Sequence, residues 1–175
     1  MERLKISTLI SEDLLKKRIT EMASEITKKY KGQNLVTICV LRGAFMFYSD
    51  LIRQLDMDVS CEFFGCSSYK STKSSGEVKL TLDLTQPIQD KNVLLVEDIV
   101  DTGLTMSYLM KTLKARDPKT LSTACLLLKP EALKIPCEVD HVGFKIGNDY
   151  VVGYGLDFED YYRNLPYIGK IENIN

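Results

Sequence analysis

Three short runs of largely apolar residues, the first of them rich in β-branched side chains, constrain the fold of this chain most. They cover residues 35–41, 93–96 and 124–128. A continuous apolar run of this length suits a strand that is buried on both faces, as in a parallel sheet with helices on both sides. The first two runs are each followed by a polar turn and a helix-like segment. The pattern predicts an α/β fold with a mostly parallel, twisted sheet flanked by helices, whose ligands bind at the carboxyl ends of the strands.

A helix is predicted before the first of these strands. Its apolar residues recur at helical spacing at Leu15, Ile19, Met22, Ile26 and Tyr30. Ser11 is a suitable N-cap, and Gly32 is a suitable end for the helix. A second helix is expected over residues 45–55, and a third with Leu109 and Leu113 on one face. Residues 78–84 alternate strictly between apolar and polar, which predicts an antiparallel or edge strand.

Length and composition favour one domain over residues 1–175, because 175 residues that are 45% hydrophobic suffice for one core. Lys and Arg total 23 against 24 for Asp and Glu, so no excess of basic residues favours a nucleic-acid partner. Charges interrupt the N-terminal residues, and no later run is long and apolar enough to span a membrane. These features predict a cytoplasmic location, with no membrane partner.

Cysteine and histidine usage argues against a thiol or zinc site. The five cysteines are odd in number and include no C-x-x-C pair, so we expect reduced and mostly buried thiols. The single histidine, His141, has no ligand-spaced partners and is expected to be structural. Gly153-Tyr154-Gly155 begins a dinucleotide-binding pattern, but Phe158 stands where a small residue is required. No G-x-x-x-x-G-K occurs, so both nucleotide motifs are rejected.

The segment over about residues 67–77 is rich in Ser, Lys and Gly and has little to bury. We expect a mobile loop there. Such a loop is either a surface excursion or a lid over a site, and its composition alone leaves both readings open.

The most informative string is VLLVEDIVDTGLT, residues 93–105. Glu97 and Asp98 follow an apolar strand, where they suit the vicinal hydroxyls of a ribose, directly or through Mg²⁺. The turn at residues 102–105 opens a helix, and free amides at a helix N-terminus suit a phosphate. The competing interpretation is that Asp98 or Asp101 simply caps this helix.

This string resembles the phosphoribosyl-pyrophosphate signature of the type I phosphoribosyltransferases. Further matches favour the hypoxanthine-guanine branch of that family and fall in the family's order: Leu41-Arg42-Gly43, Ser68-Tyr69, Lys129 and residues 142–169. The resemblance covers about residues 35–169. It implies an added small hood formed by the N- and C-terminal segments, a homodimer or homotetramer, and Mg²⁺ as cofactor.

The resemblance also implies roles around the sugar. The 5′-phosphate would be held by Thr102, Gly103, Leu104 and Thr105. Glu97 and Asp98 would hold the ribose, and these two acids and Asp157 would be the metal ligands. Asp101 would be the general base near the purine N7, and with the phosphate-loop residues it would line the ribose and phosphate site. Many members have a lysine in place of Arg42 and a basic residue in place of Leu104.

The remaining implied roles concern pyrophosphate and purine. Pyrophosphate would be bound by Arg42, Gly43 and Arg163, where the family has a cis peptide between Leu41 and Arg42. The purine would be bound by Ile99, Lys129, Tyr150, Val151 and Asp157. Ser68 and Tyr69 would belong to the lid. Taken singly, Lys129 reads as a strand-end lysine reaching water, Tyr150 as a core residue and Arg163 as solvated surface.

The function implied is purine salvage, in which a 5-phosphoribosyl group passes from phosphoribosyl pyrophosphate to hypoxanthine or guanine. The products would be IMP or GMP and pyrophosphate. The rival hypothesis is a regulatory protein that uses the same fold to sense phosphoribosyl pyrophosphate and to bind a nucleic acid. The near-neutral charge and the joint presence of Asp101, Lys129 and Tyr150 argue for the enzyme.

Overall fold

A computed structural model describes residues 4–68 and 78–173. Within them, the larger sheet has the strand order β4-β3-β2-β5-β6-β7. Its strands are β2 (Leu35–Leu41), β3 (Val59–Ser68), β4 (Val78–Leu82), β5 (Asn92–Val100), β6 (Thr120–Leu128) and β7 (His141–Lys145). Every neighbouring pair is parallel except β3 with β4. The predicted α/β sheet and its antiparallel edge strand are confirmed, although that strand ends at Leu82 rather than at residue 84.

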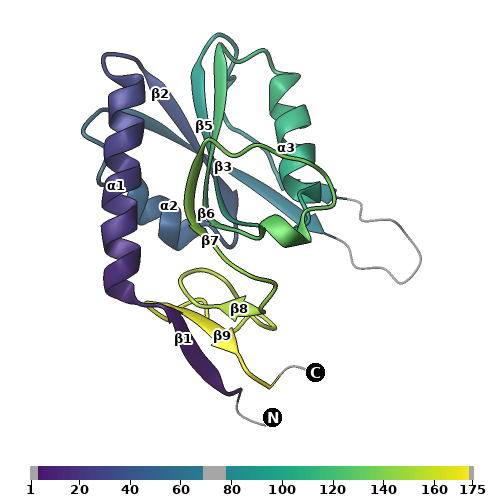
Figure 1. Ribbon diagram of the computed structural model, residues 1–175. Coiled ribbons are helices and arrows are strands. Elements are labelled where there is room, and N and C mark those ends of the chain that lie inside the picture. The colour runs from purple at the N-terminus through teal and green to yellow at the C-terminus, as the bar shows by residue number, and fades with distance from the viewer. Residues whose placement is uncertain (1–3, 69–77, 174–175) are drawn as a thin grey trace.

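Helices cover both faces of this sheet (Figure 1). On one side lie α1 (Glu12–Tyr30) and α2 (Phe45–Ile52), and on the other lies α3 (Leu104–Lys114). A short 3-10 helix, η1 (Pro130–Ala132), follows β6. Leu94 and Val96 of β5 pack in the cluster with α1 and α2, whereas Val93 and Leu95 pack with α3. Both faces of the strand are therefore buried, which explains its uninterrupted apolar run.

Helix α1 begins and ends where the sequence predicts. The Ser11 hydroxyl accepts a hydrogen bond from the Leu14 amide at 3.4 Å, as an N-cap does. The last helical residue is Tyr30, and Gly32 follows with a φ of 73°. Helix α2 is shorter than expected. It ends at Ile52, because the Leu55 amide bonds the Ile52 carbonyl in a tight turn that stops the helix.

A small antiparallel sheet joins the two ends of the chain in the order β1-β9-β8. Its strands are β1 (Ile6–Ile10), β8 (Val151–Val152) and β9 (Ile168–Ile171), and they lie at one end of the larger sheet (Figure 1). This is the predicted hood. Tyr154 and Ile168 from the hood pack in the same cluster as α1 and α2. The Tyr154 hydroxyl also donates to the Asp50 carboxylate of α2, so the hood is fixed to the core by both apolar and polar contacts.

Several smaller expectations have mixed outcomes. All five cysteines are free, with Cys39 and Cys125 buried, but Cys61 is exposed, so burial of the thiols is only partly confirmed. Cys61 lies before the part of β3 that pairs with β4, so at this point β3 is the edge of the sheet as described and is less covered. Most of the predicted loop over residues 67–77, Tyr69 included, lies outside the described residues, and Ser68 is the last residue of β3. The role of this loop as a lid stays a prediction.

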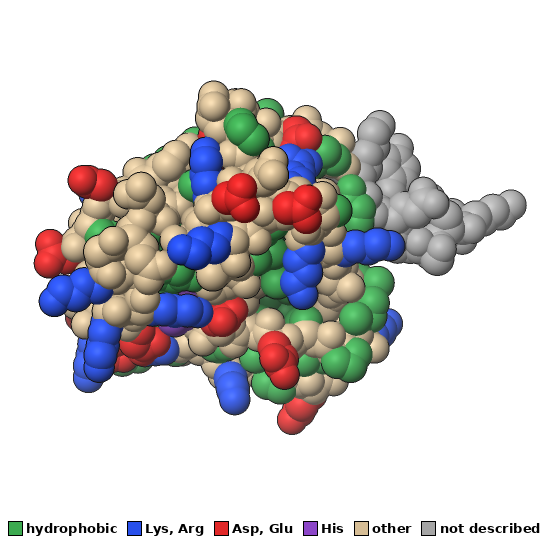
Figure 2. Space-filling model, turned by 90° about the horizontal axis from the view of Figure 1, so that it is seen from above, with side chains coloured by type: hydrophobic (Ala, Val, Ile, Leu, Met, Phe, Trp, Pro, Cys, Tyr) green, Lys and Arg blue, Asp and Glu red, His purple; other side chains and the backbone are tan. Residues whose placement is uncertain are grey.

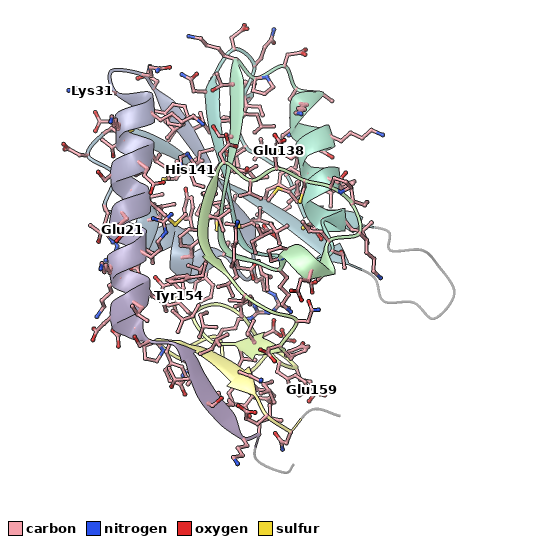
Figure 3. The ribbon with its side chains drawn as sticks, viewed as in Figure 1. Glu21, Lys31, Glu138, His141, Tyr154 and Glu159 are labelled. Carbon is pink, nitrogen blue, oxygen red and sulfur yellow. The ribbon has the colours of Figure 1, made fainter. Side chains whose placement is uncertain are left out.

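His141 lies on β7 beside α1 (Figure 3). Its side chain is buried, with Nδ1 3.6 Å from Glu25 Oε2. Burial lowers the pKa of the imidazole, so the neutral form is favoured. The face of the molecule in Figure 2 has acidic and basic side chains interspersed rather than one basic stripe. None of the helices described here is long and apolar enough to span a bilayer.

Candidate active site

The first two acids of the signature string, Glu97 and Asp98, lie on β5 itself rather than after it. The strand was predicted to end at residue 96, but it pairs with β6 from Asn92 opposite Thr120 to Val100 opposite Leu128. Glu97 and Asp98 are therefore held by the sheet. Asp101, Thr102 and Gly103 then form a turn before α3. A regular backbone fixes such side chains more accurately than a loop would.

This turn has the character of an anion site. Gly103 is the N-cap of α3, with a left-handed φ of 83° and no side-chain capping bond. Neither Asp98 nor Asp101 caps the helix, so that interpretation of the acids is wrong. A cavity of about 180 Å³ reaches from the acids of β5 to the first turn of α3. It is lined by Glu97, Asp98, Ile99, Val100, Asp101, Thr102, Gly103, Thr105 and Met106. The side chain of Leu104 is exposed and does not line it.

Glu97 and Asp98 carry the clearest electrostatic signal in the structure. Glu97 is buried, and its Oε2 atom has no hydrogen-bond partner among the described residues. Burial raises the pKa of Glu97 well above its ordinary value, and the neighbouring Asp98 raises it further. Burial also raises the pKa of Asp98 to about 6, although the Ile99 amide donates to its Oδ1 at 2.8 Å. Two crowded carboxyls of this kind mark a binding site.

These carboxyls suit a hard divalent cation, which prefers oxygen ligands. Glu97, whose Oε2 has no hydrogen-bond partner among the described residues, lines a cavity that Asp98 and Asp157 also line. Within residues 4–68 and 78–173, no group of three or more His, Cys, Asp or Glu side chains could hold a metal alone. A cation here would complete its coordination with water and substrate oxygens, which is the usual habit of Mg²⁺.

A second cavity, of about 590 Å³, opens on the other side of Asp98. It is lined by Val40, Leu41, Arg42, Gly43, Gly65, Cys66, Thr81, Leu82, Glu97, Asp98, Thr105, Asp157 and Arg163. The Leu41–Arg42 peptide bond is cis, as the family resemblance led us to expect. The sequence reasoning missed Cys66 and Thr81, which reach this cavity from β3 and β4.

The two arginines of this cavity are held very differently. Arg163 donates to the Gly155 carbonyl at 2.7 Å and lies 2.7 Å from Asp157 Oδ1, so it is not the solvated surface residue that it resembles in isolation. Arg42 extends from the loop after β2, and its Nη2 lies 2.9 Å from Asp160 Oδ1. Gly155 lies against this loop, since a Cβ atom on it would come within 2.1 Å of the Gly43 carbonyl oxygen.

The third cavity, of about 320 Å³, lies between β5, β6 and the hood. It is lined by Asp98, Ile99, Asp101, Lys129, Tyr150, Val151, Leu156 and Asp157. Lys129 is only 8% exposed, so it is not a lysine reaching water. Tyr150 is 46% exposed and meets Phe158 edge-on, with ring centroids 5.6 Å apart, so it is not a core residue. Leu156 is a further lining residue that the sequence did not indicate.

Asp98 lines all three cavities. Among the predicted site residues whose side chains the structure describes, only Leu104 lines none of the three, and Tyr69 lies outside the described residues. A separate cavity of about 650 Å³ lies at the opposite ends of β2, β3 and β5. Two buried side-chain atoms lack a hydrogen-bond partner among the described residues, and neither Glu97 nor His141, which carry them, lines this cavity. One contiguous site thus has three chemically distinct parts.

The phosphoribosyl transferase domain model matches residues 7–159. The chain belongs to the phosphoribosyl transferase family. This phosphoribosyl transferase is similar to the hypoxanthine-guanine phosphoribosyltransferase of Dictyostelium discoideum. The two are 44% identical over 169 residues, and the match covers 94% of each chain. It is also 45% identical over 165 residues to the bifunctional protein TilS/HprT of Listeria innocua. The match covers 94% of this chain but only 26% of that longer protein.

A solved structure gives the same result for this phosphoribosyl transferase fold. The hypoxanthine phosphoribosyltransferase of Trypanosoma cruzi, in complex with the product IMP, matches with a TM-score of 0.90 and 40% identity. The match covers 99% of this chain and 97% of that one. The resemblance to the hypoxanthine-guanine branch is therefore confirmed by both sequence and fold.

Proposed function

We propose that this chain transfers the 5-phosphoribosyl group of phosphoribosyl pyrophosphate to hypoxanthine or guanine, giving IMP or GMP and pyrophosphate in purine salvage. One observation carries the proposal. Asp98 lines three adjoining cavities, and each of them matches a different part of the reacting pair. The ribose would lie at Asp98, with its 5′-phosphate, the pyrophosphate and the purine each directed into one cavity. The names of the relatives support the same activity.

The smallest cavity suits the 5′-phosphate. Its turn presents the amides of the α3 N-terminus together with the hydroxyls of Thr102 and Thr105. Glu97 and Asp98 at its edge suit the ribose hydroxyls, since carboxylates accept two hydrogen bonds from a vicinal diol. The second cavity suits pyrophosphate, because Arg42 and Arg163 present guanidinium groups. Gly43 has no side chain, so pyrophosphate could approach its backbone closely.

The third cavity suits a 6-oxopurine. Tyr150 offers an exposed ring for stacking, with Phe158 fixing the ring from the side. Buried Lys129 would donate to the 6-oxo oxygen, and the Val151 backbone would read the ring edge. Ile99 and Leu156 supply apolar walls. Because stacking accepts any purine, the edge contacts must select among bases.

Asp101 would act as the general base. It lines both the phosphate cavity and the purine cavity, so it faces the point where base and sugar meet. As the purine nitrogen bonds to the ribose carbon and pyrophosphate leaves, the carboxylate would accept the proton from N7. Its negative charge would also stabilise the positive charge that develops on the ribose.

Mg²⁺ is the cofactor we propose, held by Glu97, Asp98 and Asp157. When bound, it would neutralise charge on the leaving pyrophosphate. The unpartnered oxygen of Glu97 supports this assignment. Asp157 also lies 2.7 Å from Arg163, so it would link the cation to the pyrophosphate ligands.

We further propose that residues 1–175 form one domain and that the protein works in the cytoplasm as a homodimer or homotetramer. Five free thiols support a reducing compartment. Exposed Phe63 and Leu82 offer apolar surface for self-association. Light scattering coupled to size-exclusion chromatography would measure the assembly directly.

Steady-state rates test the proposed function. Phosphoribosyl pyrophosphate would be supplied with hypoxanthine, guanine or xanthine, with and without Mg²⁺. We expect Mg²⁺-dependent turnover with hypoxanthine or guanine and stoichiometric release of pyrophosphate. Tight binding of phosphoribosyl pyrophosphate without turnover on any purine would favour the regulatory alternative instead.

A further inference from the structure

One carboxylate outside the three cavities contacts both arginines of the pyrophosphate cavity. Asp160 Oδ1 lies 2.9 Å from Arg42 Nη2 and 3.6 Å from Arg163 Nη2. Asp160 and Arg42 are 118 positions apart in the chain, so the hood brings them together. Asp160 is not itself a lining residue of the cavity. It lies beside two residues that do line the cavity, and its shorter contact is with the guanidinium of Arg42.

A tight turn aims this carboxylate. Phe158 and Tyr161 exchange two backbone hydrogen bonds, at 3.1 and 3.0 Å, and enclose Glu159 and Asp160. The Asp160 amide donates to Asp157 Oδ2 at 2.9 Å. Asp160 has a φ of 66°, in the left-handed region that aspartate tolerates better than most residues. The position of the Asp160 side chain is therefore built into the backbone.

The two arginines differ in their freedom to move. Arg163 is 21% exposed and is held by the Gly155 carbonyl and by Asp157. Arg42 is 72% exposed, and within the described residues its one ion pair is with Asp160. Arg163 thus stays in the cavity whatever Asp160 does. Arg42 is the group whose position depends on Asp160.

We propose that Asp160 competes with pyrophosphate for Arg42 and thereby lowers the affinity of the site for pyrophosphate. The inference rests on the proposed function, which makes Arg42 a pyrophosphate ligand. Carboxylate and phosphate oxygens are interchangeable acceptors for a guanidinium group, and Arg42 cannot give the same face to both. When pyrophosphate leaves, Asp160 takes its place on Arg42, which favours release of the product.

The size of the effect follows from the exposure of the pair. Asp160 is 69% exposed, so solvent screens the attraction and the pair is only modestly favoured over its open form. The apparent affinity for pyrophosphate is the intrinsic affinity multiplied by the fraction of molecules in which Arg42 is free. For an exposed pair this gives a factor of about two to six. An effect of this size tunes product release without abolishing binding.

Asp160→Asn in the full chain tests the proposal, with Glu159→Gln as the matched control. Glu159 is the adjacent residue in the same turn and forms no ion pair with any described residue, so Glu159→Gln removes one negative charge without touching Arg42. Calorimetric titration with inorganic pyrophosphate and Mg²⁺ would give the dissociation constants. We expect Asp160→Asn to tighten binding about two- to sixfold at low ionic strength, and more than Glu159→Gln does.

A double variant separates direct competition from a general charge effect. In an Arg42→Met background, Asp160→Asn should change pyrophosphate affinity no more than Glu159→Gln does, because the pair no longer exists. Equal effects of the two substitutions in the wild-type background, or weaker binding in Asp160→Asn, would overturn the inference while leaving the proposed function intact. A wild-type protein that binds no pyrophosphate with Mg²⁺ would overturn both.

Discussion

Lys129 Nζ lies 3.8 Å from Asp101 Oδ2, and both residues line the cavity that we propose for the purine. The two residues follow neighbouring parallel strands, and the Lys129 amide bonds the Val100 carbonyl at 2.9 Å, which fixes their separation. The donor that we propose for the purine and the acceptor that we propose for its proton are thus placed side by side by the pairing of β5 with β6. Their substitution should affect different kinetic constants.

Asp101→Asn should lower kcat about 10²- to 10⁴-fold, because the amide cannot accept the N7 proton. The KM values should change little, since the shape of the cavity is kept. Glu138→Gln, in the loop before β7, is the surface control (Figure 3). Rates with hypoxanthine and phosphoribosyl pyrophosphate would measure the effect, and unchanged turnover would exclude Asp101 as the base.

Lys129→Gln should raise KM for hypoxanthine about 10- to 100-fold, the range for losing a hydrogen bond from a charged group. The KM for phosphoribosyl pyrophosphate should change far less. Lys134→Gln, at an exposed lysine in the turn after η1, serves as the control. Loss of affinity for both substrates together would point to a structural role for Lys129 instead.

Gly155→Ala should destabilise the protein by about 2–5 kcal/mol and reduce activity, since a Cβ atom would meet the Gly43 carbonyl oxygen and φ is 100°. Gly32→Ala is a matched control, because Gly32 has a similar φ of 73° but open space around it. It should cost about 1–2 kcal/mol and leave activity normal. Urea unfolding measures both, and equal losses would show that contact with Gly43 is unimportant.

His141→Gln should make the free energy of unfolding fall less steeply as the pH becomes mildly acid. Burial lowers the pKa of folded His141 below its ordinary value of 6.5, so the unfolded chain binds more protons in this range. This residue therefore lowers the free energy of unfolding as pH falls from about 7 through 6.5 to the folded pKa. The measurement is the difference between wild type and variant in urea unfolding across pH 5–8. A difference independent of pH would contradict the assignment.

Much of the fold could be predicted because each element has its own local pattern. The apolar runs of β2, β5 and β6 and the periodic face of α1 depend only on neighbouring residues. The end of β5 was misjudged for a physical reason. Glu97 and Asp98 interrupt the apolar run, whereas the hydrogen bonding to β6 continues to Val100.

Residues that line the three cavities were predictable where a motif carried them and not where only the fold brings them together. Cys66, Thr81 and Leu156 have no local pattern that connects them with β5. The contact between Asp160 and Arg42 depends on how the hood docks, which periodicity does not encode. Lys129 differs from an ordinary strand-end lysine in being buried. That burial depends on the positions of the hood and η1, which the sequence pattern does not give.

The pairing of β5 along its whole length has a consequence for natural variation. Successive side chains of a strand point to opposite faces, so inserting or deleting one residue between Asn92 and Val96 would exchange the directions of Glu97 and Asp98. A change placed before Leu94 would also turn Leu94 and Leu95 toward the wrong helices. Homologues that keep this chemistry should accept substitutions in this strand far more readily than a change in its length.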